Sequence, residues 1–262
     1  PADVCEQVVG HSLKAGYRHV DSAAAYRNEA PCGQAIHKSH LPREDIFFTS
    51  KIPTRNLSYE NTQSTVDNTL KVTGLEYIDL MLIHAPYGGR EARKGAWKAL
   101  VEAQEAGKIR SLGISNYGVH HLDEMEVYMK ELEEERGKGK AGVISVGQWE
   151  LHPWLARPDI VQWCEKRGIV LESYSPLVRG ERMDSMLLQP LMKKYGKTAA
   201  QVLLRWSLQR GFVPLPKSVT PSRIEENTNV YDFELTQEDM KSLETGEYSP
   251  CTWDPTVSSL EQ

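Results

Sequence analysis

Short apolar segments alternate with longer amphipathic segments along the chain. The short segments are rich in β-branched residues and are apolar through most of their length, which is typical of strands buried on both faces of a sheet. They predict seven strands, at residues 18–23, 45–52, 77–85, 109–116, 143–151, 169–175 and 212–217. The longer segments carry apolar residues at helical spacing. They predict eight main helices, at residues 2–15, 29–39, 59–73, 91–106, 121–135, 158–167, 199–209 and 222–230.

Residues that cap helices stand at the ends of these predicted segments. Glycines follow four of the helical segments, as they do at C-terminal caps: Gly16, Gly74, Gly107 and Gly168. Thr198, with Gln201 three residues later, predicts a capping box. Thr220 followed by Pro221 predicts an N-cap with proline at the first helical position. The caps therefore support the predicted boundaries.

Strand–helix alternation predicts parallel strands joined by right-handed crossovers. An open doubly wound sheet and a closed (β/α)8 TIM barrel both fit this pattern. A dinucleotide-binding doubly wound sheet should carry G-x-G-x-x-G after its first strand, and the nearest glycine cluster, Gly88-Gly89, has the wrong spacing. The repeat number favours the barrel, and without an obvious linker residues 1–262 are interpreted as one domain. The charge-rich run 130–140 predicts a flexible surface loop.

The composition is that of an ordinary globular protein and excludes several classes. The 262 residues include 31 Lys and Arg against 36 Asp and Glu, a formal net charge of −5, which argues against a nucleic-acid-binding protein. The sequence contains no run of eighteen apolar residues, so no membrane-spanning helix is predicted. Residues 1–10 lack the features of a secretory signal. The four cysteines are Cys5, Cys32, Cys164 and Cys251, and none lies in a CxxC pair. This spacing predicts separate reduced thiols in a cytoplasmic protein and no metal site.

Four proton-carrying side chains stand at or just beyond the ends of the first three predicted strands. These are Asp21, Tyr26, Lys51 and His84. Each alone has an ordinary structural interpretation, but the active sites of barrels lie where the strands end, so their joint placement favours catalysis. A lysine ammonium should lower the pKa of a neighbouring tyrosine, and a buried aspartate should hold that lysine charged. A histidine beside the hydroxyl can donate a hydrogen bond or relay a proton. The group therefore predicts a general acid that protonates an oxygen.

These residues lie in sequence blocks that resemble the aldo-keto reductase family. Asp21-Ser-Ala-Ala-Ala-Tyr26-Arg-Asn28-Glu29 resembles the signature D-[TS]-A-x-x-Y-x-N-E. Five further blocks match in order: Lys51 in Thr-Ser-Lys-Ile, His84 in Leu-Ile-His-Ala-Pro, Gly113-Ile-Ser115-Asn116-Tyr, Gln148-Trp-Glu-Leu-His-Pro and Tyr174-Ser-Pro-Leu177. The last block is Pro216-Lys217-Ser218-Val-Thr-Pro-Ser-Arg223-Ile-Glu-Glu226-Asn227. The resemblance covers nearly the whole chain, and the short connections look like those of fungal or bacterial members.

The resemblance implies an NADP(H)-dependent reductase of aldehydes and ketones. It implies that Tyr26 is the general acid, with Lys51, Asp21 and His84 as supporting groups. Residues implied to contact the nicotinamide part of the cofactor are Ser115, Asn116 and Gln148, which bind its carboxamide, and Tyr174, which stacks on the ring. Ser175 and Leu177 are implied to lie along the pyrophosphate and adenosine. The partner is a small carbonyl compound, no metal is implied, and the chain is expected to be a monomer or a weak homo-oligomer.

The last block adds its own indication of the cofactor. Thr220-Pro221 opens a predicted helix, whose N-terminus favours an anion. Lys217, Ser218 and Arg223 flank that terminus with donors suited to a dianionic phosphate. The pattern favours NADPH, which carries a 2′-phosphate, over NADH. The resemblance further implies that Glu226 and Asn227 meet the adenine.

Members of the family usually begin with a hairpin and a strand carrying Gly-Thr, and this chain has neither. A barrel missing a strand exposes two edges, so we expect residues before Pro1 to be missing rather than a natural seven-stranded form. Two other functions stay open: a cofactor-binding regulatory subunit with little turnover, and a barrel isomerase or aldolase that uses Lys51 as a Schiff base. Aromatic residues that could line the substrate site, or instead pack in the core, are Tyr87, Trp149, Trp154 and Trp253.

Overall fold

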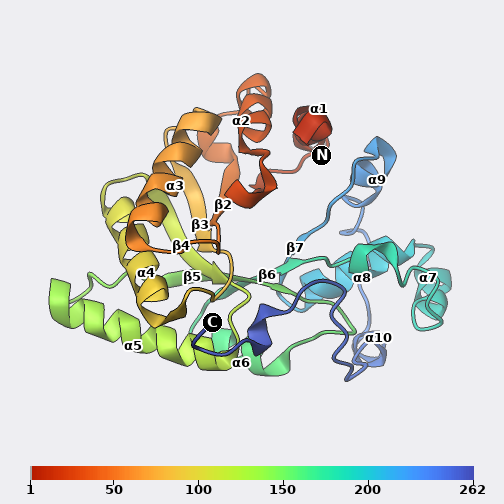
Figure 1. The fold of residues 1–262 in the computed structure, drawn as a ribbon. Coiled ribbons are helices and arrows are strands. Elements are labelled where there is room, and N and C mark those ends of the chain that lie inside the picture. The colour runs from red at the N-terminus through yellow and green to blue at the C-terminus, as the bar shows by residue number, and fades with distance from the viewer. Residues whose placement is uncertain (1) are drawn as a thin grey trace. The chain divides into compact units, whose positions relative to one another are not determined.

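The computed structural model describes residues 2–262, which divide into two compact units. The first unit contains residues 2–147 together with Asp254–Gln262, and the second contains Gln148–Trp253. Helices and strands alternate through both units, as the sequence predicts (Figure 1). The seven strands follow one another in chain order, from β1 to β7. The prediction of a single domain stays a prediction, and each unit is described by itself.

The first unit is built on parallel strands. These are β1 (His19–Asp21), β2 (Phe47–Ile52), β3 (Ile78–Ile83), β4 (Ile109–Ser115) and the first part of β5 (Ile144–Glu150). The helices are α1 (Ala2–Lys14), α2 (Glu29–Lys38), α3 (Tyr59–Thr73), α4 (Gly89–Glu105) and α5 (Val119–Arg136). Short 3₁₀ turns cover Ala24–Tyr26, Arg43–Asp45 and Pro255–Val257. Asp21 pairs with Thr49, and Lys51 pairs with Leu82, so the polar residues at the ends of β1 and β2 come to the same edge.

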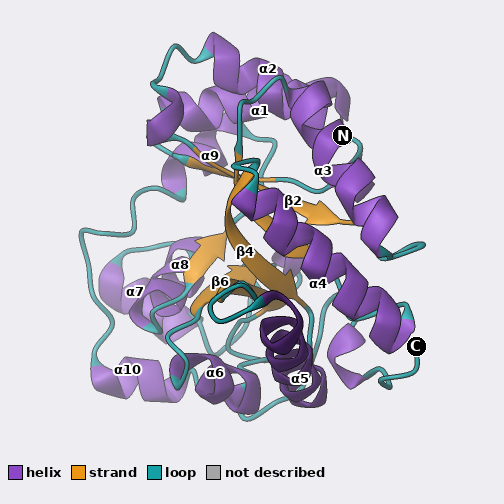
Figure 2. Cartoon of the chain, turned by 90° about the vertical axis from the view of Figure 1, so that its left-hand side faces the viewer, coloured by secondary structure: helices purple, strands orange, loops and turns teal. Residues whose placement is uncertain are grey.

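The core of the first unit lies between these strands and their helices. Every residue of β3 is buried, and Leu80 and Leu82 pack with Val146 in one cluster. Helices α3 and α4 contact each other and the strands β2 and β4 (Figures 1 and 2). Trp97, fully buried on α4, donates from Nε1 to the carbonyl of Ala141 at 2.8 Å, which fixes the segment that leads into β5.

The second unit contains the end of β5 and the parallel pair β6 (Val170–Tyr174) and β7 (Val213–Leu215). Tyr174 pairs with Leu215. The helices are α6 (Pro158–Glu165), α7 (Gln189–Tyr195), α8 (Ala199–Gln209), α9 (Pro221–Glu226) and α10 (Gln237–Ser242), and a 3₁₀ turn covers Val178–Gly180. Thr198 caps α8 in the predicted capping box with Gln201. Among residues 2–262, no helix is long and apolar enough to cross a membrane.

The structure confirms all seven predicted strands and all eight predicted helices, and it corrects three details. The strands are shorter than predicted by one or more residues at most ends. Helices α7 and α10 are additional, because their short spans carry too few apolar repeats to predict a helix. The prediction of a surface loop over residues 130–140 is wrong for residues 130–136, because α5 continues to Arg136, and it is confirmed for residues 137–140, which lie outside any helix or strand. Ion pairs from α4 explain the extension: Lys94 binds Glu131 at 2.7 Å, and Lys98 binds Glu135 at 2.5 Å.

Candidate active site

The four predicted catalytic residues come together in the first unit. Asp21 is the last residue of β1, Lys51 lies near the end of β2, and His84 follows β3 directly. Tyr26 ends the 3₁₀ turn that follows β1. Because β1, β2 and β3 are parallel neighbours, their carboxyl ends place these side chains at one edge.

Lys51 is the centre of the group. Its side chain is fully buried, and its Nζ donates to Asp21 Oδ1 at 2.6 Å and to the carbonyl of Ser22 at 2.7 Å. A buried ammonium is stable only when it is paired and hydrogen-bonded, and both conditions are met here. The pair therefore holds a fixed positive charge at the end of β2.

Tyr26 lies against this charge and against His84. The Nζ atom of Lys51 is 5.1 Å from the centroid of the Tyr26 ring. The rings of Tyr26 and His84 meet edge to face, with centroids 5.7 Å apart and planes at 77°. The tyrosine is 49% exposed, so an incoming molecule can reach it, whereas the lysine beneath it cannot be reached.

The electrostatics of Tyr26 differ in net direction from the sequence prediction. Burial of the hydroxyl raises its pKa above the ordinary value, the Lys51 ammonium acts to lower it, and Asp21 acts to raise it. The predicted effect of Lys51 has the right sign, but the prediction of a lowered pKa is wrong, because desolvation outweighs the lysine. Burial and then the Lys51 charge lower the pKa of His84 to about 4, so His84 is neutral near pH 7.

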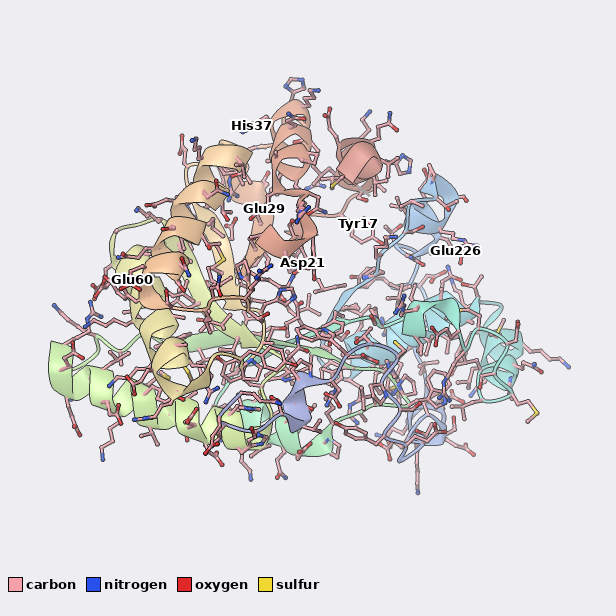
Figure 3. All side chains as sticks on the ribbon, viewed as in Figure 1. Tyr17, Asp21, Glu29, His37, Glu60 and Glu226 are labelled. Atoms are coloured by element: carbon pink, nitrogen blue, oxygen red, sulfur yellow. The ribbon has the colours of Figure 1, made fainter. Side chains whose placement is uncertain are left out.

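Three residues near the group were not singled out from the sequence. Ser22 accepts from Lys51, and His19 contacts Thr49 Oγ1 through Nε2 at 2.9 Å. Glu29 is buried on α2, where Figure 3 labels it. It accepts from Ser50 Oγ at 2.6 Å and from Thr69 Oγ1, and so joins α2 to β2 and α3. Ser22 and Glu29 lie within the signature block, which was the available signal.

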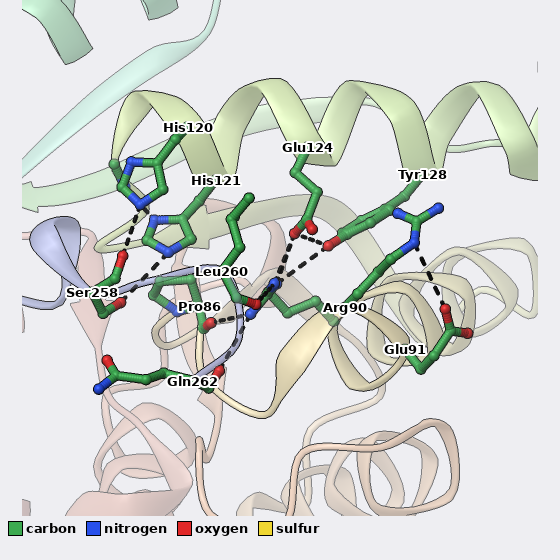
Figure 4. Close-up of polar contacts among 12 residues, drawn as sticks. Pro86, Arg90, Glu91, His120, His121, Glu124, Tyr128, Ser258, Leu260 and Gln262 are labelled. Carbon is green, nitrogen blue, oxygen red and sulfur yellow. Dashed lines mark hydrogen bonds and ion pairs between the residues drawn. The ribbon is translucent and has the colours of Figure 1, made fainter.

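A buried arginine supports the loop that follows His84. Arg93 donates from Nη1 to the carbonyl of Pro86 at 2.6 Å and from Nη2 to that of Leu260 at 2.5 Å. Its guanidinium also donates to Glu124. The Glu124 carboxylate accepts a hydrogen bond from Tyr128, and both of these residues are labelled in Figure 4. Arg93 therefore joins α4, α5, the loop after β3 and the segment 254–262. The sequence carries no local signal of this cluster.

Two predicted cofactor residues lie at the end of β4 in the first unit. Ser115 and Asn116 are buried, and Asn116 adopts a left-handed backbone with φ of +62°. Asn116 Nδ2 donates to the carbonyl of His84 at 3.0 Å and to Ser115 Oγ at 3.1 Å. These bonds join the end of β4 to the residue that contacts Tyr26.

The second unit holds the other predicted nicotinamide and pyrophosphate residues. Gln148 lies on β5, and its Nε2 donates to the buried Glu172 on β6 at 2.7 Å. Tyr174 ends β6 half-buried, and Ser175 follows it with φ of +48°. Leu177 lies half-buried just beyond.

The last predicted block follows β7. Lys217 and Arg223 are exposed, and neither forms an ion pair with any residue of the span 2–262. Ser218 Oγ accepts from the Thr220 backbone N–H at 3.1 Å. Helix α9 is shorter than predicted and ends at Glu226, whose carboxylate accepts from Thr198 Oγ1 at 2.7 Å. Asn227 is buried directly after it.

The aromatic residues proposed for substrate contact fall into two groups. Trp149 and Trp154 are buried, which favours the core-packing alternative for both. In the first unit Tyr87 is half-buried, and in the second unit Trp253 is 45% exposed. Only the latter two keep accessible surface for a ligand.

One cluster in the second unit has metal-ligating residue types that the sequence spacing did not reveal. Ligand atoms of Glu150, His152 and Cys251 lie within 4.8 Å of one another. Burial would raise the pKa of Glu150, but hydrogen bonds from His152, Thr252 and the Cys251 N–H lower it to about 2. The carboxylate is thus occupied by protein donors, and the cluster anchors the segment around Cys251 to β5.

Nearly the whole chain is similar to known proteins of one family. The Aldo/keto reductase family matches residues 3–246. An uncharacterized oxidoreductase of Schizosaccharomyces pombe is 44% identical over 98% of this chain and 90% of its own, and the glyoxal reductase of Bacillus subtilis is 40% identical over 89% and 80%. The crystal structure of MGS-M4, an aldo-keto reductase from a Medee basin deep-sea metagenome library, has a TM-score of 0.86 at 36% identity, with coverage of 97% and 90%. The α/β barrel predicted from the sequence is confirmed, and the chain belongs to the aldo/keto reductase family of oxidoreductases.

Proposed function

We propose that this chain reduces aldehydes or ketones to alcohols with NADPH, and that Tyr26 donates the proton. The observation that carries the proposal is the half-exposed Tyr26 ring, which lies on the buried, charged Lys51 and against the neutral His84. A carbonyl oxygen placed at the phenol would gain a proton donor next to a fixed positive charge. Both features stabilise negative charge as it develops on that oxygen.

The supporting residues have separate tasks in this reaction. Asp21 keeps Lys51 charged and fixes the position of its ammonium. Lys51 favours the phenolate that remains after the proton leaves Tyr26. His84 is neutral, so one ring nitrogen carries a hydrogen and can donate to the substrate oxygen. The carbonyl of His84 accepts from Asn116, which holds this residue in place.

The residues of the chain fit a nicotinamide cofactor. Bound NADPH would supply the hydride. We assign its carboxamide to Ser115, Asn116 and Gln148, its ring to Tyr174, and its pyrophosphate and adenosine to Ser175 and Leu177, with Glu226 and Asn227 at the adenine. Tyr174 supports this assignment because it ends a strand with an accessible ring.

The preference for NADPH over NADH rests on Lys217 and Arg223. Both side chains are exposed, and neither forms an ion pair within residues 2–262. Ser218 and the start of α9 lie between them in the sequence. An ammonium and a guanidinium without acidic partners suit a dianionic phosphate. We therefore expect Arg223→Ala to weaken NADPH binding and to leave NADH binding nearly unchanged.

A Schiff-base reaction at Lys51 is disfavoured by the same geometry. An amine must be neutral to attack a carbonyl, and the contact between Lys51 and Asp21 favours the charged form. The lysine is also fully buried, beneath the exposed tyrosine.

The test follows the absorbance of NADPH with a panel of carbonyl compounds that includes glyoxal, for which the Bacillus subtilis relative is named. We expect turnover with small aldehydes, and we expect Tyr26→Phe to lower kcat by about 10²- to 10⁴-fold. Its affinity for NADPH, measured by fluorescence or calorimetry, should stay within about twofold of the wild type.

Tyr231→Phe is the matched control, because Tyr231 is 76% exposed and far along the chain from this group. It should retain full activity. Tight NADPH binding without oxidation by any carbonyl would favour the regulatory, cofactor-binding alternative. A large loss of NADPH affinity in Tyr26→Phe would contradict the assignment of Tyr26 as the acid.

A further inference from the structure

Two cysteine thiols face each other outside the proposed catalytic group. Cys5 on α1 and Cys32 on α2 have their Sγ atoms 3.5 Å apart, although 27 residues separate them in the chain. The two helices pack together in the first unit (Figure 1). A disulfide bond is about 2.05 Å long, so the sulfurs need to approach by only about 1.5 Å. Side-chain rotation supplies movements of that size without moving a helix.

A second contact joins the same two helices near the thiols. Lys38 on α2 binds Glu6 on α1, with Nζ and Oε1 2.6 Å apart. Glu6 is the neighbour of Cys5 in the chain, so this ion pair lies beside the two thiols. Cys164 and Cys251, in contrast, contact no other sulfur among residues 2–262.

We propose that Cys5 and Cys32 are a thiol-oxidation site, at which a hydroperoxide converts the pair into a reversible disulfide that joins α1 to α2. The Cys5 thiolate attacks an oxygen of the hydroperoxide, the O–O bond breaks, and the alcohol or water leaves with a proton. Cys5 is then a sulfenic acid. The Cys32 sulfur attacks the Cys5 sulfur, the S–O bond breaks, and water leaves. The two thiols lose two electrons, and the hydroperoxide gains them.

Cys5 is the thiol that reacts first. It is 9% exposed, whereas Cys32 is 2% exposed. The Cys32 hydrogen bond lowers the pKa of Cys5 to about 7, and the same contact, with burial, raises the pKa of Cys32. The thiolate is the reactive form, so a lowered pKa and greater exposure act together. Cys32 keeps its proton until the sulfenic acid forms and then resolves it.

Access to the pair is controlled by α1. Between Val4 and Lys14, the only buried side chains are Cys5 and Leu13. A helix with so few buried side chains opens locally at a low free-energy cost, and such opening admits small oxidants. Cys164 is fully buried, and burial raises its pKa to about 12, so it should resist the same reagent.

The test oxidises the wild-type chain with an equimolar amount of hydrogen peroxide, then unfolds it and alkylates the remaining thiols. We expect two of the four thiols to be lost, one cross-linked peptide pair that contains Cys5 and Cys32, and full recovery with dithiothreitol. The oxidised chain should also melt about 5 °C higher, because the bond restricts the unfolded chain.

Matched variants separate this pair from the other thiols. Cys5→Ser and Cys32→Ser should each abolish the cross-link, and Cys164→Ser should leave it unchanged. The proposal is overturned if wild-type protein keeps four free thiols, if Cys5 proceeds to sulfinic acid while Cys32 stays a thiol, or if the cross-link joins other cysteines or two chains. The wild-type peptide map decides this alone, even if a variant fails to fold. None of these readouts depends on reductase activity.

Discussion

The ammonium of Lys51 lies 2.6 Å from Asp21 Oδ1, and the lysine side chain has no exposed surface. Desolvation makes an unpaired charge at this position costly, so the carboxylate is needed for folding as well as for the proposed chemistry. The same contact places a positive charge 5.1 Å from the centre of the Tyr26 ring. Stability and activity should therefore respond together when either partner changes.

Replacement of Asp21 tests this coupling. Asp21→Asn removes the charge but keeps the shape, and we expect a loss of about 3 kcal/mol in the free energy of unfolding, since it leaves a buried ammonium without its counter-ion. Urea denaturation measures the loss. Asp67→Asn is the control, because Asp67 pairs with Lys108 at the surface, where an ion pair contributes about 0 to 1 kcal/mol. Equal losses in the two variants would contradict the role of burial.

The lowered pKa of His84 predicts a pH dependence of stability. Its folded value is about 4, and an unfolded histidine titrates near 6.5. Between these values the unfolded chain binds more protons, so this contribution is present above about pH 6.5 and is lost as the pH falls toward 4. The pKa of His121 is also lowered to about 4, mainly by burial, and acts in the same direction.

Single variants measure how much each of the two histidines contributes to this pH dependence. His84→Gln and His121→Gln should each flatten the slope of unfolding free energy between pH 4 and 6.5, and the double variant should flatten it further. The NMR titration of the His84 ring, assigned by its loss in His84→Gln, should show a midpoint near pH 4. A midpoint near 6.5 would show that His84 is not desolvated as described.

The hydrogen bonds of Arg93 link the segment 254–262 to the loop after His84. Arg93→Met removes donors to Pro86, Leu260 and Glu124, and should cost about 3–5 kcal/mol, because it leaves Glu124 without its buried partner. Limited proteolysis should then cleave the terminal segment faster. Arg90→Met is the matched control, since Arg90 is partly exposed on the same helix and pairs with Glu131. If the terminal segment is equally resistant in both variants, Arg93 does not anchor it.

The sequence predicted the elements, and it predicted that four side chains would lie together at the ends of the first strands, for local reasons. Strand positions follow from short apolar runs, and strand ends fix where the polar residues after them can lie. Asp21, Tyr26, Lys51 and His84 therefore come together as soon as the first three strands are parallel. Capping by Thr198 could be predicted because its partner Gln201 is three residues away.

Features that depend on distant residues could not be predicted. The Arg93 cluster joins residues separated by up to 169 positions, and the Cys5–Cys32 contact depends on how α1 packs on α2. The net pKa shift of Tyr26 was missed for a related reason. The sign of the Lys51 contribution follows from charge alone, but the larger desolvation depends on packing around the hydroxyl, which the sequence does not display.

Gly33 on α2 packs so closely against the end of α3 that no side chain fits between them. A Cβ atom at this position would lie 2.2 Å from the carbonyl oxygen of Thr73, and backbone cannot move aside as a flexible side chain can. Gly33→Ala should therefore cost about 3 kcal/mol or more, although alanine favours helices. Gly10→Ala, in α1, is the matched control: its Cβ would meet nothing within 4 Å. That variant should gain about 0.5–1 kcal/mol from helix propensity. Denaturation of both variants compares the two positions, and a neutral or stabilising Gly33→Ala would mean that α2 does not approach Thr73 this closely.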